Sequence, residues 1–191
     1  MREALAAGLR CALVLWLACG LLYPLAVTGA ARLFPFQADG SLLREADGTI
    51  IGSRLIGQAW VAPRWFHGRS SATSGGPYNA SASGGSNLGP TSELLARRLA
   101  ADRKALETAQ PELLGVALPA DALTASGSGL DPDVSVANAL LQVPRIARER
   151  GVSQAVLRAF VLAHVAGRSL GFFGEPRVNV LELNLALDRS F

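Results

Sequence analysis

Serine, histidine and aspartate side chains are the first candidates for chemistry in this sequence, because together they could form a hydrolytic site. Ser128 lies in the Ser-Gly-Ser-Gly run 126–129, which lacks the Gly-x-Ser-x-Gly pattern of a nucleophile elbow. His164 lies in an apolar stretch, where a half-buried structural role is the usual one, and His67 lies in a loop without an evident partner. Since no base can be paired with a nucleophile and an orienting acid, the sequence does not favour a hydrolase.

A glycine-rich run is the second candidate, because its backbone N–H groups could hold an anion. The run lacks the lysine and the following serine or threonine of a P-loop, so a tight turn that needs glycine is the alternative interpretation. It lies within segment 67–92, half of which is Gly or Ser, and a loop of this length in a compact domain is usually functional or disordered. The candidate residues are Ser83, Gly84, Gly85, Ser86 and Asn87.

Composition and charge exclude several other functions. The chain has 191 residues, half of them apolar, which fits one domain with an appendage. Its 18 basic and 15 acidic side chains form no run of like charge, so nucleic-acid binding has little support. Two cysteines and two histidines are too few for a disulfide framework or a thiolate zinc site. Asp131 and Asp133 could bind a cation, but turn and cap roles are commoner for such carboxylates.

The N-terminal region contains an uncharged run long enough to cross a membrane. Arg10 and Arg32 bracket residues 11–31, which would span roughly 32 Å as an α-helix, against a hydrocarbon core of about 30 Å. A cleaved signal peptide is the alternative, but its apolar core is usually shorter, so an uncleaved anchor is favoured. Pro24 lies inside the run and is better tolerated in a membrane helix than in a soluble one.

Charge around this run predicts its orientation. More positive charge precedes the run than follows it over the next dozen residues, which favours the N-terminus inside. We therefore expect a cytoplasmic N-terminus (1–10), a transmembrane helix (11–31) in the cell (inner) membrane and an extracytoplasmic soluble domain (32–191). Ala26 and Ala30, four residues apart, could let a partner helix approach closely, although general alanine richness explains the pair equally well.

The extracytoplasmic part predicts an α+β domain of helices and short strands. Residues 41–58 are typical of short strands around the turn pair Asp47-Gly48. Three aromatic residues follow, and we expect them in or over a small core: Trp60, Trp65 and Phe66. A helix is predicted over 92–109, because its leucines recur on one face and its charges pair at i,i+4 on the other.

Helix caps and breakers define the C-terminal third. Ser135 is a plausible N-cap for a helix to Arg150 that Pro144 breaks or kinks, and Ser153 can cap a helix to about Gly167. In the tail, apolar residues first fall on even positions (178 and 180) and then on odd positions (181 to 187), so one straight strand could not place them all on one face. We expect a short strand ending near Val178, followed by a helix to about Asp188 with Asn179 at its N-terminus.

Seven stretches resemble the C subunits of Kdp-type potassium-transporting ATPases. Each is weak alone, but they occur in the order of that family along nearly the whole chain. They are LYPL (22–25), GSRLIGQ (52–58), FHGRSSAT (66–73), SGGSNLGP (83–90), TASGSGLD (124–131), PRIA (144–147) and GEPRVNVLELN (174–184).

The resemblance implies an accessory subunit of a high-affinity ATP-driven potassium uptake complex. In that family the C subunit assists assembly and raises the ATP affinity of the pump subunit, as a catalytic chaperone without an active site of its own. The implied partners are a channel-like potassium subunit, a P-type ATP-hydrolysing subunit and a very small stabilising subunit. No cofactor of its own is implied, since ATP with Mg is used by the pump subunit. The alternative is a free-standing membrane-anchored envelope binding protein or hydrolase.

The sequence departs from the family where a nucleotide contact is concerned. Some members carry Gln before the Ala-Ser-Gly-Gly-Ser run, which makes it similar to the signature loop of ATP-binding-cassette proteins, whereas Ser81 stands here. Ser70 likewise stands where the family usually has Pro. The run 83–87 could contact a partner or a nucleotide. Because ATP is absent outside the cytoplasm, our hypothesis is that loop 67–92 packs against the extracytoplasmic mouth of the potassium subunit.

Overall fold

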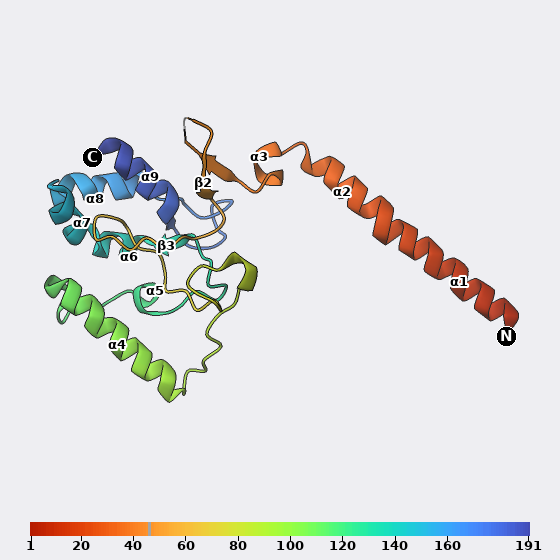
Figure 1. The fold of residues 1–191 in the computed structure, drawn as a ribbon, viewed down its shortest axis with the longest axis horizontal. Helices are drawn as coiled ribbons and strands as arrows, with labels where there is room; N and C mark the ends of the chain where they lie inside the picture. Colours follow the sequence, from red (N-terminus) through yellow and green to blue (C-terminus); the bar gives the residue numbers. More distant parts are fainter. Residues whose placement is uncertain (46) are drawn as a thin grey trace. The chain divides into compact units, whose positions relative to one another are not determined.

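The computed structural model describes residues 1–45 and 47–191. The predicted strand region 41–58 therefore includes one residue, Ala46, that lies outside the described residues. The chain divides into two units, Met1–Leu42 and Leu43–Phe191, and each is a structural body in itself (Figure 1).

The first unit contains one long apolar helix. It consists of α1 (Arg2–Leu17), a π-helical turn η1 (Ala18–Leu22) and α2 (Tyr23–Ala31), and a short helix α3 (Pro35–Ala38) follows. The 30-residue helix is long and apolar enough to cross a membrane, and none of its most apolar part is buried in the protein. The predicted apolar helix is therefore present, and it begins at Arg2.

Pro24 is accommodated by a local widening of this helix. Proline lacks an N–H, and its ring clashes with the carbonyl four residues earlier, which here belongs to Gly20. Gly20 lies within the π-helical turn η1, where hydrogen bonds join residues five apart instead of four. The helix thus continues past the proline without interruption.

In its described residues, the second unit contains small two-stranded sheets. Strand β1 (Leu42–Arg44), at the boundary between the units, pairs with β2 (Ile50–Ser53). Strand β3 (Asp133–Ser135) is antiparallel to β4 (Arg177–Asn179), with Val134 opposite Val178. Together with the helices, these strands confirm the predicted α+β class.

Side-chain caps explain where most helices of this unit begin. Ser92, Ser135, Ser153 and Asn179 each accept a hydrogen bond from the backbone N–H three residues later. The elements are η2 (Ala80–Ala82), α4 (Glu93–Ala109), η3 (Pro111–Leu113), α5 (Ala120–Leu123), α6 (Val136–Leu141), α7 (Val143–Arg150), α8 (Gln154–Ala163) and α9 (Val180–Ser190). The capping predictions and the strand-then-helix tail are confirmed.

Two predicted helix boundaries need adjustment. Pro144 stands in the first turn of α7, so the predicted helix over 135–150 is divided into α6 and α7. Helix α8 ends at Ala163, four residues before the expected end. The reason is tertiary, because Ala166 pairs its backbone with Arg177, the first residue of β4.

The core lies between α6, α7, α8, α9 and the β3–β4 pair, which gather on one side of the unit in Figure 1. Phe66 is fully buried there, and Trp60 and Trp65 pack against the same core, as their clustering in the sequence predicts. Helix α4 has no buried residue and lies beside α5. The other core side chains include Val134, Ile146, Leu157, Val161, Val178, Leu183 and Leu187.

Candidate functional site

Two glycine- and serine-rich stretches far apart in the sequence form one hydrogen-bonded assembly, which we call the loop cluster (residues 69–87 and 124–131). Ser70 and Ala125 form a parallel bridge, and the N–H of Ser126 donates to the carbonyl of Ser70 at 2.9 Å. The hydroxyl of Ser71 donates to the carbonyl of Gly129 at 2.7 Å. The two stretches are thereby fixed to each other at several points.

The predicted run 83–87 is built into this cluster. The N–H of Gly84 donates to the carbonyl of Ser128 at 2.8 Å, and the hydroxyl of Ser83 donates to the same carbonyl at 3.0 Å. Among the described residues, the side chains of Ser86 and Asn87 form no hydrogen bond. A cradle for an anion needs backbone N–H groups that converge on an open site, and the N–H of Gly84 is already used within the protein.

Glycines allow the two stretches to approach closely. A Cβ atom on Gly85 would lie 2.9 Å from the carbonyl oxygen of Gly127. Gly129 has a φ of +69°, and a Cβ there would lie 2.7 Å from the carbonyl oxygen of Gly84. Both glycines are thus required by the close approach of the two stretches, and residues 83–87 themselves run without a turn.

A partly buried ion pair joins the two stretches of the loop cluster. Arg69 pairs with Asp131 at 2.9 Å and donates to the carbonyl of Ala125 at 3.2 Å. The hydroxyl of Tyr78 donates to the carbonyl of Arg69 at 2.6 Å. Burial, with the nearby charge of Asp131, raises the pKa of Tyr78, so this hydroxyl keeps its proton at neutral pH.

The two carboxylates around Pro132 have structural roles. Asp131 accepts from the N–H of Asp133 as well as from Arg69, while Asp133 pairs with Arg177 at 3.0 Å and accepts from Asn179 at 3.2 Å. The described part of the chain contains no group of three or more potential metal ligands. Asp131 thus has the turn role, bonding the backbone two residues on, whereas Asp133 serves as an ion-pair partner across the β3–β4 pair.

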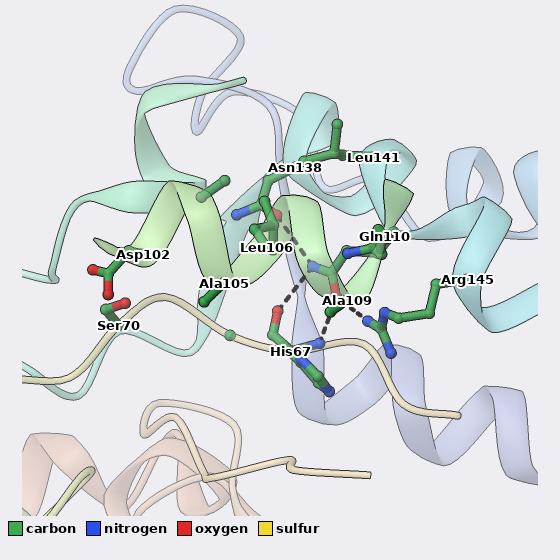
Figure 2. Close-up of a pocket in the computed structure, with 13 residues that line it drawn as sticks. His67, Ser70, Asp102, Ala105, Leu106, Ala109, Gln110, Asn138, Leu141 and Arg145 are labelled. Atoms are coloured by element: carbon green, nitrogen blue, oxygen red, sulfur yellow. Dashed lines mark hydrogen bonds between the residues drawn. The ribbon is translucent and has the colours of Figure 1, made fainter. Parts of the chain in front are cut away.

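Beside the loop cluster, a pocket of about 330 Å³ lies between α4 and the core helices (Figure 2). Its floor is a chain of buried polar groups. Gln142 accepts a hydrogen bond from the N–H of His67 at 2.8 Å and donates one to the carbonyl of His67 at 3.0 Å. Its side-chain amide thus pairs with the two backbone groups that a neighbouring strand would otherwise bind. Gln142 also binds Asn138 at 3.1 Å and Arg145 at 2.8 Å. Figure 2 shows these bonds as dashed lines.

Arg145 is a buried cation, 5% exposed, that is held mainly by neutral acceptors. It donates to the carbonyls of Pro63 and Trp65 and to Gln142. Burial lowers its pKa to about 10, so the guanidinium remains charged at neutral pH. Asn184, on α9, has a similar role. It accepts a hydrogen bond from the N–H of Phe66 and donates one to the carbonyl of Phe66, both at 2.9 Å. We refer to Asn138, Gln142, Arg145 and Asn184 as the polar clamp.

Sequence reasoning missed the polar clamp. The signal was present, since Asn138, Gln142 and Arg145 recur at i, i+4 and i+7, which would place them on one face of a helix. Polar residues at this spacing are usually a solvated face, and burial of the face could not be read from the spacing. The clamp fixes segment 63–67, which leads into the loop cluster two residues later.

The pocket also brings together His67, Ser70 and Asp102, the residue types of a hydrolytic triad. No hydrogen bond joins them within the described residues, and Figure 2 shows Ser70 and Asp102 at one end with His67 toward the other. The Nε2 atom of His67 lies 3.2 Å from the carbonyl of Ala62 instead. His164 is half-buried, with Nδ1 2.8 Å from the carbonyl of Phe160. Both rings therefore bind the backbone.

His67 predicts a pH dependence of stability. Burial, with the positive charge of Arg145 as a second cause, lowers the pKa of His67 below its usual value near 6.5. Its stabilising contribution is complete above the unfolded pKa and is lost as the pH falls through 6.5 toward the folded pKa. We expect the free energy of unfolding to fall as the pH is lowered from about 7.5 through 6.5. Urea titrations should show a smaller fall for His67→Gln, and equal falls in both proteins would contradict this account.

Ala26 and Ala30, the predicted helix-packing pair, lie on α2 and are exposed to solvent in the isolated chain. Their spacing of four residues places them on one face of that helix.

Comparison with known proteins agrees with the resemblance seen in the sequence. The family model for KdpC, described as "K+-transporting ATPase, c chain", matches residues 5–189. A potassium-transporting ATPase KdpC subunit from Caulobacter vibrioides (strain NA1000 / CB15N) is 57% identical over 173 residues, covering 90% of this chain and 86% of the relative. The KdpC subunits of Methylobacterium nodulans and Bradyrhizobium diazoefficiens are 55% and 52% identical, over 91% and 93% of this chain and 90% and 92% of theirs.

These matches cover nearly the whole chain at high identity, from the apolar N-terminal helix to α9. They leave the alternative of a free-standing envelope protein without support. The chain belongs to the KdpC family and is a subunit of a potassium-transporting ATPase.

Proposed function

We propose that this chain is a non-catalytic accessory subunit that assists assembly of the potassium uptake complex and raises the ATP affinity of its pump subunit. Two observations support a non-catalytic role. The rings of His67 and His164 bind backbone carbonyls, and no nucleophile is hydrogen-bonded to either within the described part of the chain. ATP with Mg is used, in this proposal, by the P-type ATP-hydrolysing subunit alone.

The observation that carries the proposal is the internal use of the run 83–87. The hydroxyl of Ser83 and the N–H of Gly84 both donate to the carbonyl of Ser128. The run is therefore a fixed part of the loop cluster and not an open phosphate cradle. Ser86 and Asn87 keep their polar side chains available. A fixed surface with a few available polar groups is suited to contact with another protein, because little ordering is needed on binding.

In this proposal the second unit lies outside the cytoplasm, anchored by the N-terminal helix. Greater positive charge before the uncharged run 11–31 than just after it supports this orientation. The loop cluster then packs against the extracytoplasmic mouth of the channel-like potassium subunit, while the very small subunit stabilises the assembly elsewhere. Any effect on ATP passes through the complex as a coupling free energy, typically 1–3 kcal/mol.

Crosslinking in the intact, actively hydrolysing complex tests the proposal. A cysteine at Ser86, in a Cys11→Ser, Cys19→Ser background, is expected to crosslink to the potassium subunit. A cysteine at the exposed residue Ala101 on α4 is the matched control and should not. A photoreactive ATP analogue should label the pump subunit and not residues 83–87. Labelling of that run by the analogue would overturn the proposal.

The alanine pair in α2 gives a separate prediction. In the complex, Ala26 and Ala30 are proposed to lie against a neighbouring transmembrane helix, where small residues permit close approach. Ala26→Phe should then separate the helices and lower the amount of this subunit that co-purifies in mild detergent. Ala31→Phe, one residue beyond the pair, is the control. An unchanged subunit ratio for Ala26→Phe would show that the alanines reflect composition only.

A further inference from the structure

A tyrosine lies deep inside the apolar run that is long enough to cross a membrane. Tyr23 begins α2, nine residues before Arg32 and thirteen after Arg10, the charged residues that bracket the run. At 1.5 Å per residue, its Cα lies roughly 13 Å and roughly 20 Å along the helix from these two ends. Since the hydrocarbon core is about 30 Å thick, the Tyr23 side chain lies near the middle of the bilayer when the helix spans it.

The Tyr23 hydroxyl has no hydrogen-bond partner in the described part of this chain, and the side chain is 67% exposed. Serine and threonine hydroxyls in a helix can bond a carbonyl of the preceding turn, but the phenol ring holds the tyrosine hydroxyl away from its own backbone. Tyrosine is therefore enriched at the membrane–water interface, where its polar end meets water. In the middle of the hydrocarbon core there is no water to take this role.

The face of α2 that carries Tyr23 also carries the alanine pair. Ala26 and Ala30 follow Tyr23 by three and seven residues within one continuous α-helix, so the three side chains lie on one side of it. Small residues permit the close approach of another helix. A neighbouring helix that packs on the two alanines therefore passes beside the Tyr23 hydroxyl, one turn nearer the centre of the bilayer.

We infer that the Tyr23 hydroxyl donates a hydrogen bond, near the middle of the membrane, to a polar side chain on a transmembrane helix of another subunit of the ATPase complex. Lipid does not fit this position, because hydrocarbon chains accept no hydrogen bond and an unsatisfied hydroxyl among them is costly. Amide, hydroxyl and imidazole side chains are the groups that bond across helices in membranes. The inference deepens the proposed packing of Ala26 and Ala30, and rests on it for the side from which the partner helix comes.

Photocrosslinking tests what lies beside the hydroxyl. 4-Azidophenylalanine at position 23 places its reactive nitrogen where the hydroxyl is. In the full complex reconstituted in lipid, it is expected to form an adduct with another protein subunit. The control is the same group in place of Leu25, which is similarly exposed (62%) but lies on the other side of α2. An adduct with lipid alone from position 23, or an equal yield of protein adduct from position 25, would overturn the inference.

Removal of the hydroxyl tests the hydrogen bond itself. Tyr23→Phe keeps the ring and should lower the amount of this subunit that co-purifies in mild detergent by about threefold, as expected for an average hydrogen bond between membrane helices. Thr28→Val removes a hydroxyl five residues later, from the opposite side of α2, and should leave the subunit ratio unchanged. A ratio for Tyr23→Phe equal to that of the unsubstituted chain would contradict the hydrogen bond.

The outcomes separate this inference from the proposed function. If Ala26→Phe releases the subunit and Tyr23→Phe does not, the packing of α2 stands and the hydrogen bond fails. If position 86 gives no crosslink to the potassium subunit while position 23 gives a protein adduct, the proposed place of the loop cluster fails and the contact within the membrane stands.

Discussion

Replacing Asn184 by leucine is expected to lower the free energy of unfolding of the second unit by about 2–5 kcal/mol. The Asn184 side chain is fully buried and satisfies both the N–H and the carbonyl of Phe66, which is itself fully buried. Leucine has a similar volume but leaves two buried backbone groups without partners, at about 1–3 kcal/mol each. Urea titration of the full chain in mild detergent, followed by tryptophan fluorescence, measures the change, since Trp60 and Trp65 pack on the same core.

Gln154→Leu is the matched control for this substitution. Gln154 is exposed at the start of α8, so the same type of change there should alter stability by no more than about 0.5 kcal/mol. If Asn184→Leu were as mild as Gln154→Leu, the hydrogen bonds to Phe66 could not be a main support of the segment that leads into the loop cluster.

Local structure was predictable because its causes lie within a few residues of one another. A helix begins where a serine or asparagine side chain accepts a hydrogen bond from the N–H three residues later, just before apolar residues start to recur at helical spacing. Ser135, Ser153 and Asn179 do this. Pro144 marked a break for a similarly local reason. The end of α8 was placed too late because a distant residue, Arg177, determines it.

Contacts across long sequence separations were not predictable from spacing alone. The glycines in residues 69–87 and 124–131 indicated turns, but the sequence of neither stretch indicates that it binds the other. Their meeting shows only in the hydrogen bonds between them, such as that of Ser126 with Ser70 and that of Ser71 with Gly129. The sequence therefore predicted the candidate residues 83–87 and their loop, whereas the partner stretch 124–131 required the structure.

The second large effect is expected from Gly129→Ala, which should raise the ATP concentration for half-maximal hydrolysis by the complex about fivefold or more. A Cβ on Gly129 would lie 2.5 Å from the Thr73 side chain and 2.7 Å from the carbonyl oxygen of Gly84. The threonine methyl cannot turn away without moving the hydroxyl that bonds to Gly76, and the Gly84 oxygen belongs to the backbone. The run 83–87 must therefore move away from residues 124–131, and the surface proposed to meet the potassium subunit changes shape.

Gly115→Ala isolates the contribution of this collision. Gly115 has a similar φ of +75°, but no atom would lie within 4 Å of an added Cβ. Both variants carry the backbone strain of alanine at positive φ, about 1 kcal/mol, and only Gly129→Ala displaces the loop cluster. ATP-dependent hydrolysis should therefore separate the two variants even where their melting temperatures are similar. If Gly129→Ala assembled into the complex with normal ATP affinity, coupling would have to run through another surface, because the displaced run could no longer present the same contact.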